Sequence, residues 1–360
     1  MNILSCENLF VNSKVLFFMT FLGIFIPCSY LLRIIKLIQI KKPNNERFSQ
    51  GMSQNPASQK VKIYTFSAII LIAVAILLRT VNYLCIFDSD ILYFANHPLH
   101  TIYRTLTILT VLWLLSMLIF IPRHSFSTKT VAPCSIFSRG LALFGGIVVF
   151  ASFFFFRDCM HYYIAHAKFY QLLALLALPC AVYFFSYFNQ NIPQAARALC
   201  GYMTLLWLGL LLSVTYLNLF VTMNSPLKIS LHLAVIALML HVLENIRESV
   251  GRPFRIHGYA YTLIAALLCG VASFPVIVAY LTKCHSNVDY LFYALLMLGF
   301  FLHLCARTRD NYRVLMVTQP ASPEEIEEEK RAKEVKNKKS SSKSTENSIE
   351  NDKGDDSHVS

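Results

Sequence analysis

The sequence predicts an all-α fold: a polytopic membrane helix bundle of about nine transmembrane helices, built as one anchor helix and four helical hairpins. Composition is the first reason, because 56% of the 360 residues are hydrophobic and only 14% are charged. Soluble domains carry about 25% charged residues, and the mean hydropathy of +0.51 excludes that class. The second reason is that the uncharged runs match the roughly 20 residues a membrane-crossing helix needs.

Nine runs free of Asp, Glu, Lys and Arg define the expected helices. In order they are 15–32, 63–87 (interrupted by Arg79), 105–122, 140–156, 169–196, 198–227, 229–243, 256–282 and 290–306. Between them lie clusters such as 189–193 and 224–226, where Pro, Asn and Ser break helices. The first run ends in basic residues without a cleavage pattern, so we interpret it as an anchor helix rather than a signal peptide.

The last three hairpins begin at Arg139, Arg197 and Arg255, each 58 residues after the one before. This spacing is typical of a repeat, but it is also the length that any helical hairpin requires. Both interpretations stay open. Units of two helices keep one orientation, which disfavours the inverted repeats of many secondary transporters.

Basic residues predict the orientation. Before residue 318, the loops on one side of the membrane hold 17 Lys and Arg residues, and those on the other side hold 6. Basic loops remain in the cytoplasm, so we expect the N-terminus outside and the C-terminus inside, with the inner loops against anionic lipid. The net charge of +12 therefore does not indicate nucleic-acid binding. No N-x-S/T sequon occurs, which favours a bacterial plasma (cell) membrane.

The chain divides into a transmembrane domain, 1–317, and a charged, largely disordered cytoplasmic tail, 318–360. A helix is expected to begin within 322–325, where Ser-Pro-Glu-Glu combines a capping residue, an early proline and a following glutamate. The tail is a candidate docking segment for a cytoplasmic protein, and a simply solvated end is the alternative.

Histidines and carboxylates gather in three turns on the predicted outer face. Imidazole and carboxylate together suit a divalent metal, although solvated turn residues are the alternative. The candidate metal ligands are Asp88, His97, His100, Asp158, His161, His166, His285 and Asp289. Because their spacing matches no recognised metal signature, we expect no cofactor, with a divalent metal at the outer face as the alternative.

Four ionisable residues within the predicted helices are candidate ligand-binding residues, because such groups are costly in a membrane and often functional. They are Arg79, His232, His241 and His303. Arg79 is expected to extend toward the headgroups or to pair with an acid such as Asp158. His241 and His303 lie at matched depth, as axial haem ligands would, but hydrogen bonding between helices is the commoner role of neutral histidine.

Glu244, Arg247 and Glu248 have the spacing of ion pairs along one helix. No nucleophile elbow, phosphate-binding loop or C-x-x-C motif occurs, so an enzyme is not expected.

The sequence favours a non-catalytic integral membrane protein that senses a signal at its outer face or scaffolds a partner through the tail. The alternative is a permease for a small solute or cation, with Arg79 and the buried histidines on its path; an enzyme acting on lipid or haem is least supported. A permease predicts a water-filled cavity reaching Arg79, whereas a sensor or scaffold predicts a dry bundle.

Overall fold

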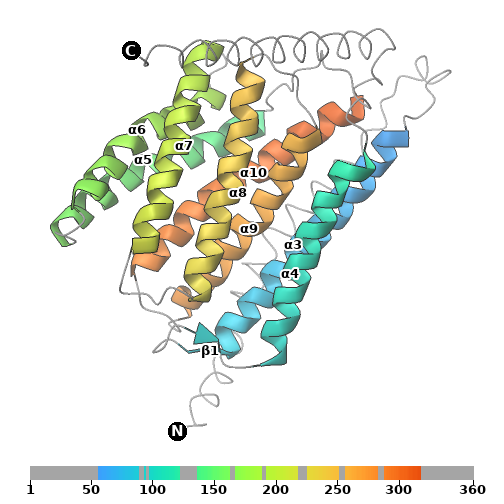
Figure 1. Cartoon of the computed structure of the whole chain (residues 1–360), viewed down its shortest axis with the longest axis horizontal. Coiled ribbons are helices and arrows are strands. Elements are labelled where there is room, and N and C mark those ends of the chain that lie inside the picture. Colours follow the sequence, from blue (N-terminus) through green and yellow to red (C-terminus); the bar gives the residue numbers. More distant parts are fainter. Residues whose placement is uncertain are drawn as a thin grey trace, which may run out of the picture.

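Eight long helices make up most of the computed structural model (Figure 1). The structure describes residues 56–88, 93–94, 97–121, 136–162, 167–188, 192–217, 225–250, 256–282 and 288–317. Within them the helices are α3 (Pro56–Cys85), α4 (Pro98–Phe120), α5 (Ile136–Tyr162), α6 (Ala167–Phe188), α7 (Gln194–Leu217), α8 (Pro226–Ser249), α9 (Ile256–Leu281) and α10 (Val288–Val317). All eight are long and apolar enough to span a membrane.

Each of these helices falls on one of the predicted spans, which confirms the membrane-spanning helical character of the chain. The remaining predicted span, 15–32, lies outside the described residues, and so does the tail, 318–360. The count of nine, the anchor helix and the disordered tail therefore stay predictions.

A small hairpin connects the first two described helices. Strand β1 (Phe87–Asp88) pairs antiparallel with strand β2 (Tyr93–Phe94), and Phe87 lies opposite Phe94. It adds two very short strands to an otherwise helical fold. Below, the end of the bundle that holds this hairpin is called the hairpin end, and the end where α10 finishes is called the tail end (Figure 1).

Helix ends coincide with the predicted helix breakers. The break at 189–193 is confirmed, since α6 ends at Phe188 and α7 begins at Gln194. Helix α8 begins at Pro226, where the missing N–H of proline removes no helical hydrogen bond. The uncharged run 229–243 predicts a shorter helix than the 24 residues observed, because α8 includes charged side chains near both of its ends.

Helices α5 to α10 form a closed ring. Each consecutive pair from α5 to α10 is in contact, and α10 closes the ring by packing against α5. The α3–α4 pair packs on α9 from outside the ring, at the right of Figure 1. Helix α9 therefore has neighbours on most of its surface, which explains why most of its side chains are buried. This ring defines an interior in which side chains from six helices meet.

Polar side chains also join the helices. Between α3 and α9, Thr65 Oγ1 and the Tyr259 hydroxyl are 2.7 Å apart. Between α3 and α4, the Trp113 indole N–H donates to Ser67 Oγ at 2.9 Å. Because lipid is as apolar as the helix surfaces, such hydrogen bonds and close packing, rather than the hydrophobic effect, hold membrane helices together.

Glycine allows the closest approaches between helices. A Cβ atom at Gly270 on α9 would lie 2.7 Å from Ile76 Cδ1 and 3.0 Å from the nearest ring atom of Phe301. A Cβ atom at Gly209 on α7 would meet no described atom within 4 Å. A methyl group added at Gly270 therefore requires its neighbours to move, whereas one added at Gly209 does not.

Gly270→Ala is expected to lower the free energy of unfolding by about 1–3 kcal/mol, because Ile76 and Phe301 must move away from the added methyl group. Gly209→Ala is the matched control, and it is expected to be neutral or stabilising, since Ala favours a helix over Gly by about 1 kcal/mol. Unfolding in mixed micelles with increasing dodecyl sulfate measures both. Equal stability of the two variants would contradict the close packing at Gly270.

Candidate functional site

Arg79 is buried among aromatic rings near the hairpin end. Its exposed fraction is 2%, and its guanidinium carbon lies 4.3 Å from the ring centre of Phe94, 4.8 Å from that of Tyr103 and 5.0 Å from that of Tyr83. One guanidinium nitrogen donates to the carbonyl oxygen of Pro226 at 3.3 Å. Contacts between a desolvated cation and a ring contribute up to about 2 kcal/mol each, so the rings offset part of the cost of burying this charge.

The expected pairing of Arg79 with Asp158 is wrong. Asp158 is exposed, and its carboxylate lies 3.5 Å from Arg157 Nε on the same helix. The physical reason is the helix arrangement: α5, which carries Asp158, packs on α6 and α10, whereas α3 packs on α4 and α9. The guanidinium of Arg79 extends toward the hairpin end, where the ring cluster encloses it; its extension to the headgroups stays a prediction.

Two further polar contacts lie near the hairpin end, between α7 and α8. Lys228 Nζ donates to the carbonyl oxygen of Tyr216 at 2.7 Å. His232 Nε2 is 3.1 Å from Thr215 Oγ1. Both contacts join α8 to the last turn of α7, so His232 has the interhelical hydrogen bond expected for a neutral histidine.

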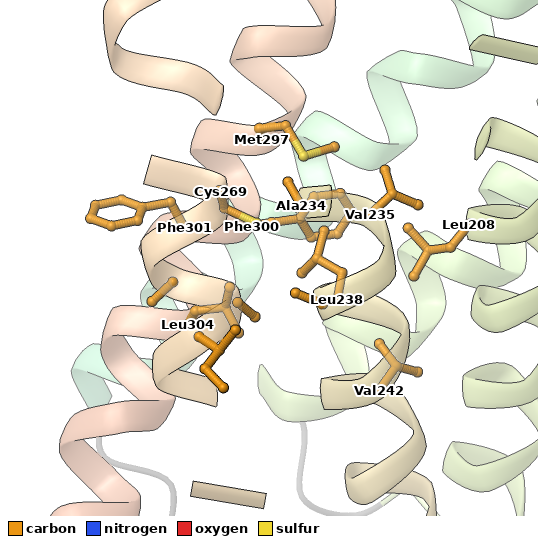
Figure 2. Packing of buried hydrophobic residues seen from close by; sticks show 14 of the residues in the cluster. Leu208, Ala234, Val235, Leu238, Val242, Cys269, Met297, Phe300, Phe301 and Leu304 are labelled. Carbon is orange, nitrogen blue, oxygen red and sulfur yellow. The ribbon is translucent and has the colours of Figure 1, made fainter. Parts of the chain in front are cut away.

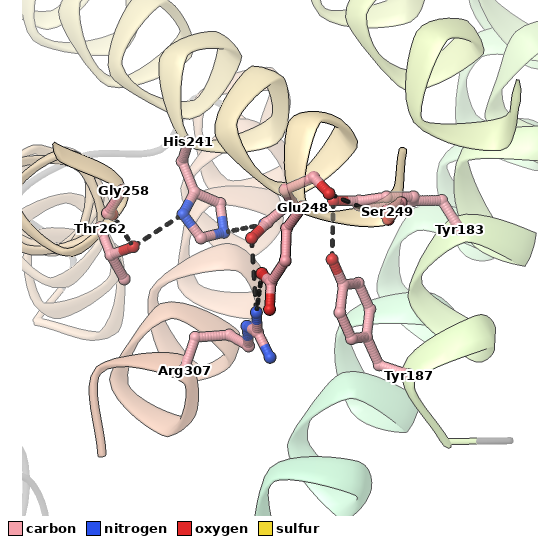
Figure 3. A network of polar contacts seen from close by, with 9 residues as sticks. Tyr183, Tyr187, His241, Glu248, Ser249, Gly258, Thr262 and Arg307 are labelled. Carbon is pink, nitrogen blue, oxygen red and sulfur yellow. Dashed lines mark hydrogen bonds and ion pairs between the residues drawn. The ribbon is translucent and has the colours of Figure 1, made fainter. Parts of the chain in front are cut away.

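His241 on α8 uses both of its ring nitrogens. Nδ1 lies 3.0 Å from Thr262 Oγ1 on α9, and Nε2 lies 2.8 Å from Asn245 Nδ2 (Figure 3). Thr262 donates its own hydroxyl proton to the carbonyl oxygen of Gly258 at 2.6 Å. The hydroxyl oxygen must therefore accept from Nδ1–H, and Nε2 accepts from the Asn245 amide. This assigns a neutral imidazole that links α8 to α9.

Arg307 on α10 lies beside His241 and connects to α8 and α6. Its Nη2 is 3.2 Å from Glu248 Oε2 and 3.4 Å from Asn245 Oδ1. Its guanidinium carbon lies 5.1 Å from the ring centre of Tyr187, whose hydroxyl is 2.9 Å from that of Tyr183 (Figure 3). Arg247 pairs with Glu244 at 2.6 Å, as their spacing predicts, while Glu248 turns toward Arg307 on α10.

His303 is buried in the same region without a hydrogen bond. Its exposed fraction is 2%, and its ring centre lies 5.1 Å from that of Phe184, 5.3 Å from that of Tyr187 and 6.2 Å from that of His241. Neither ring nitrogen has a partner within the part of the chain that the structure describes. We call this region the polar centre, and its members are Tyr183, Tyr187, His241, Asn245, Glu248, Thr262, His303 and Arg307.

The geometry does not suit axial haem ligation by His241 and His303. Their matched depth is confirmed, since the two rings are in contact, but they are tilted by 73°. Both nitrogens of His241 already have hydrogen-bond partners. A haem iron would need one of them and a porphyrin plane between the two rings.

An apolar layer fills the middle of the helix ring. Trp207 of α7 lies 6.4 Å from Phe156 of α5 and 6.3 Å from Phe300 of α10, measured between ring centres. The indole N–H of Trp207 donates to the carbonyl oxygen of Leu173 at 3.0 Å. Leu208, Val235, Leu238 and Met297 belong to the same cluster of buried residues (Figure 2). We define the apolar layer as Phe156, Trp207, Leu208, Val235, Leu238, Met297 and Phe300, all at most 2% exposed.

The layer lies between the polar residues of the hairpin end and the polar centre on α8, and next to the polar centre on α10. On α8 the chain passes from His232 through Val235 and Leu238 to His241, and on α10 it passes from Met297 and Phe300 to His303 and Arg307. The four candidate ligand-binding residues are thus divided. His241 and His303 come together on the tail-end side of the layer, while Arg79 and His232 lie on the hairpin-end side.

The candidate metal ligands are described only in part. His97 caps α4 and accepts from the Leu99 N–H at 3.2 Å, and His100 stacks on Phe94 at 4.9 Å. Within the described residues, no group of three or more His, Cys, Asp or Glu side chains is placed to hold a metal ion. The remaining candidates, whose side chains lie outside the described part, are Asp88, His161, His166, His285 and Asp289. The metal prediction therefore stays a prediction.

Sequence reasoning missed the uncharged polar residues of the polar centre and of the cluster around Arg79. Asn245 and Thr262 hold His241, and Tyr183 and Tyr187 enclose the polar centre. Asn82 is fully buried beside the Arg79 cluster. The sequence does indicate Asn82 and Asn245, because an asparagine within an apolar span needs a hydrogen-bond partner that lipid does not supply.

Comparison with protein-family models, with curated proteins and with solved structures finds no match to the chain. The class of the protein therefore follows from its own architecture: a multi-pass helical membrane protein with buried polar side chains at two levels and an apolar layer in its helix ring.

Proposed function

We propose that the chain is a non-catalytic protein of the plasma membrane that senses a signal at the hairpin end or scaffolds a partner through residues 318–360. The observation that supports this best is the apolar layer. Its side chains leave the polar centre without a hydrogen-bonded route to Arg79 through the described residues. A dry interior of this kind fits a signalling or scaffolding bundle better than a conducting one.

The proposal includes an orientation, with the N-terminus and the hairpin end outside and the tail end inside. In the described part of the chain, Lys60, Arg197, Arg247, Arg309 and Arg313 lie toward the tail end. They form part of the basic excess that predicts a cytoplasmic face, where they would lie against anionic lipid.

The orientation is tested with an epitope tag at either terminus of the full chain in intact cells. Antibody is expected to reach the N-terminal tag and to reach the C-terminal tag only after the membrane is permeabilised. Impermeant maleimide at Arg104→Cys, exposed on α4 near the hairpin end, is expected to give the same answer as the N-terminal tag. Staining of the C-terminal tag in intact cells would contradict the orientation.

The absence of conduction is tested in proteoliposomes that hold a pH-sensitive dye and a potassium gradient. The full chain is expected to leave proton flux and potassium flux at the level of empty liposomes. A scaffold or sensor further predicts that deleting 318–360 removes the cellular phenotype while the transmembrane domain still folds. Flux above that of empty liposomes would overturn the non-conducting proposal.

A permease for a small solute or cation is the second candidate, and the closed ring of α5 to α10 favours it. Polar residues lie inside this ring toward both ends, with His232 and Lys228 on one side of the layer and the polar centre on the other. Such a protein would have to open the apolar layer during transport, so it predicts flux in the assay above.

A further inference from the structure

We propose that Arg79 and Asn82 form a binding site for the carboxylate of a small organic acid whose body is apolar. The inference rests on the proposed function, because it names the chemical class of ligand that a sensor would detect at the hairpin end. It goes beyond a general role for Arg79, because it assigns a second binding residue, Asn82, and specifies that the ligand is negatively charged and has an apolar body.

The first argument is that the buried charge of Arg79 has no carboxylate partner among the side chains that the structure describes. No carboxylate whose side chain the structure describes, a set that excludes Asp88, lies within ion-pair distance of it, and its Nε is buried without a hydrogen-bond partner in that set. The aromatic rings contact the guanidinium carbon, and the carbonyl oxygen of Pro226 occupies one Nη2 donor. Tyr83 also hydrogen-bonds the guanidinium, so the donor shown to be available is Nε–H, which a carboxylate can accept.

The second argument is Asn82, one turn further along α3. It is 0% exposed, and neither its amide nitrogen nor its amide oxygen has a partner among the described residues. A buried amide without partners is unfavourable in any protein and more so in a membrane, where water does not supply the missing bonds. A ligand carboxylate that bridges Arg79 and Asn82 would satisfy the amide N–H group and the charge together.

The third argument is the electrostatic environment. Arg79 contacts the first residue of α8, so the positive end of that helix dipole lies next to the cluster. The buried ammonium group of Lys228 lies within the same first turn of α8. The N-terminus of α8 and the ammonium group of Lys228 therefore add positive electrostatic potential, which favours the binding of an anion.

The aromatic walls indicate the rest of the ligand. Phe94, Tyr103 and Tyr83 surround the guanidinium, and Phe87 stacks on Tyr83 at 4.9 Å. These surfaces suit an apolar or aromatic body attached to the carboxylate, and they are poorly suited to a fully hydrated phosphate. Phe94, from the small hairpin, lies closest to the guanidinium carbon, at 4.3 Å.

Sodium benzoate is the probe, with acetate and inorganic phosphate compared at equal ionic strength. In nanodiscs, benzoate at millimolar concentration is expected to raise the unfolding temperature of the full chain by several degrees in a saturable way. Acetate should give a smaller shift, and phosphate none. A shift with phosphate alone, or no shift with benzoate, would overturn the inferred ligand class.

Variants locate the effect. Arg79→Gln should abolish the benzoate shift, but it also disturbs the ring cluster, so Asn82→Leu supplies the decisive test. Asn82→Leu removes a buried amide without partners, and it is expected to raise the unfolding temperature without ligand and to lose most of the benzoate shift. Arg104→Gln, which removes an exposed cation on neighbouring α4, is the matched control and should keep the shift. A benzoate shift that persists in Asn82→Leu would overturn the role of Asn82.

This result is separable from the proposed function. Benzoate binding together with benzoate flux into proteoliposomes would keep the carboxylate site and assign it to a permease. Absence of binding together with absence of flux would reject the site and leave the non-conducting proposal in place.

Discussion

Replacing Arg307 by Leu is expected to be among the most destabilising single substitutions, lowering the free energy of unfolding by about 3 kcal/mol. The side chain is 4% exposed and holds Glu248 at 3.2 Å and Asn245 at 3.4 Å while stacking on Tyr187. Its loss leaves the carboxylate of Glu248 without its partner from α10. Breaking a buried ion pair costs about 3–5 kcal/mol. Because the Glu248 side chain is 22% exposed, water offsets part of this cost, and we place the effect at the lower end.

The matched control is Arg247→Leu, which breaks an exposed pair with Glu244 on the same helix. Exposed pairs contribute about 0–1 kcal/mol, so this variant should lie close to the wild type in a dodecyl sulfate titration. The double variant Arg307→Leu, Glu248→Leu should recover part of the loss, since it removes the unpaired carboxylate as well. Equal stability of Arg307→Leu and Arg247→Leu would contradict the structural role of the polar centre.

The second large effect is expected at Trp207, where substitution by Ala should cost about 3–5 kcal/mol. The indole is 0% exposed, contacts Phe156 and Phe300 across the ring interior, and donates to the Leu173 carbonyl oxygen. Removing it leaves a cavity in the apolar layer and a carbonyl without its donor. The substitution therefore removes contacts between α7 and three other helices, α5, α6 and α10.

The other tryptophan of the chain provides the comparison. Trp113 is 40% exposed, stacks on Tyr64 and donates to Ser67. Trp113→Ala should therefore destabilise the bundle by less than half as much as Trp207→Ala in the same titration. A larger loss at Trp113 than at Trp207 would show that the apolar layer does not hold the ring together.

Composition and uncharged runs predict the membrane-spanning helices well, because the requirement for about 20 apolar residues acts on each helix separately. The break at 189–193 follows from local chemistry in the same way. The closure of the ring by α5 and α10 depends on contacts between segments far apart in the chain, and no periodicity within either segment encodes it.

The same distinction between local features and contacts of distant segments applies to the candidate sites. His241 and His303 are recognisable as neighbours, because depth in the membrane can be counted along each helix. The surroundings of Arg79 are not predictable, since Phe94 and Tyr103 reach it only through the packing of α3, α4 and the small hairpin. Asn82 and Asn245 carry no charge, so a search for ionisable groups passes over them.

The central claim is that the apolar layer closes the interior of the helix ring to water. The most direct measurement is modification by an impermeant maleimide of Leu238→Cys and Phe300→Cys, each in a folded variant whose ten native cysteines are replaced. Val250→Cys, 62% exposed just after α8, is the reactive control from the tail-end side. We expect no modification at Leu238→Cys or Phe300→Cys from either side of the membrane, with complete reaction at Val250→Cys. Modification of either layer position from an aqueous face would contradict the dry interior and favour a permease.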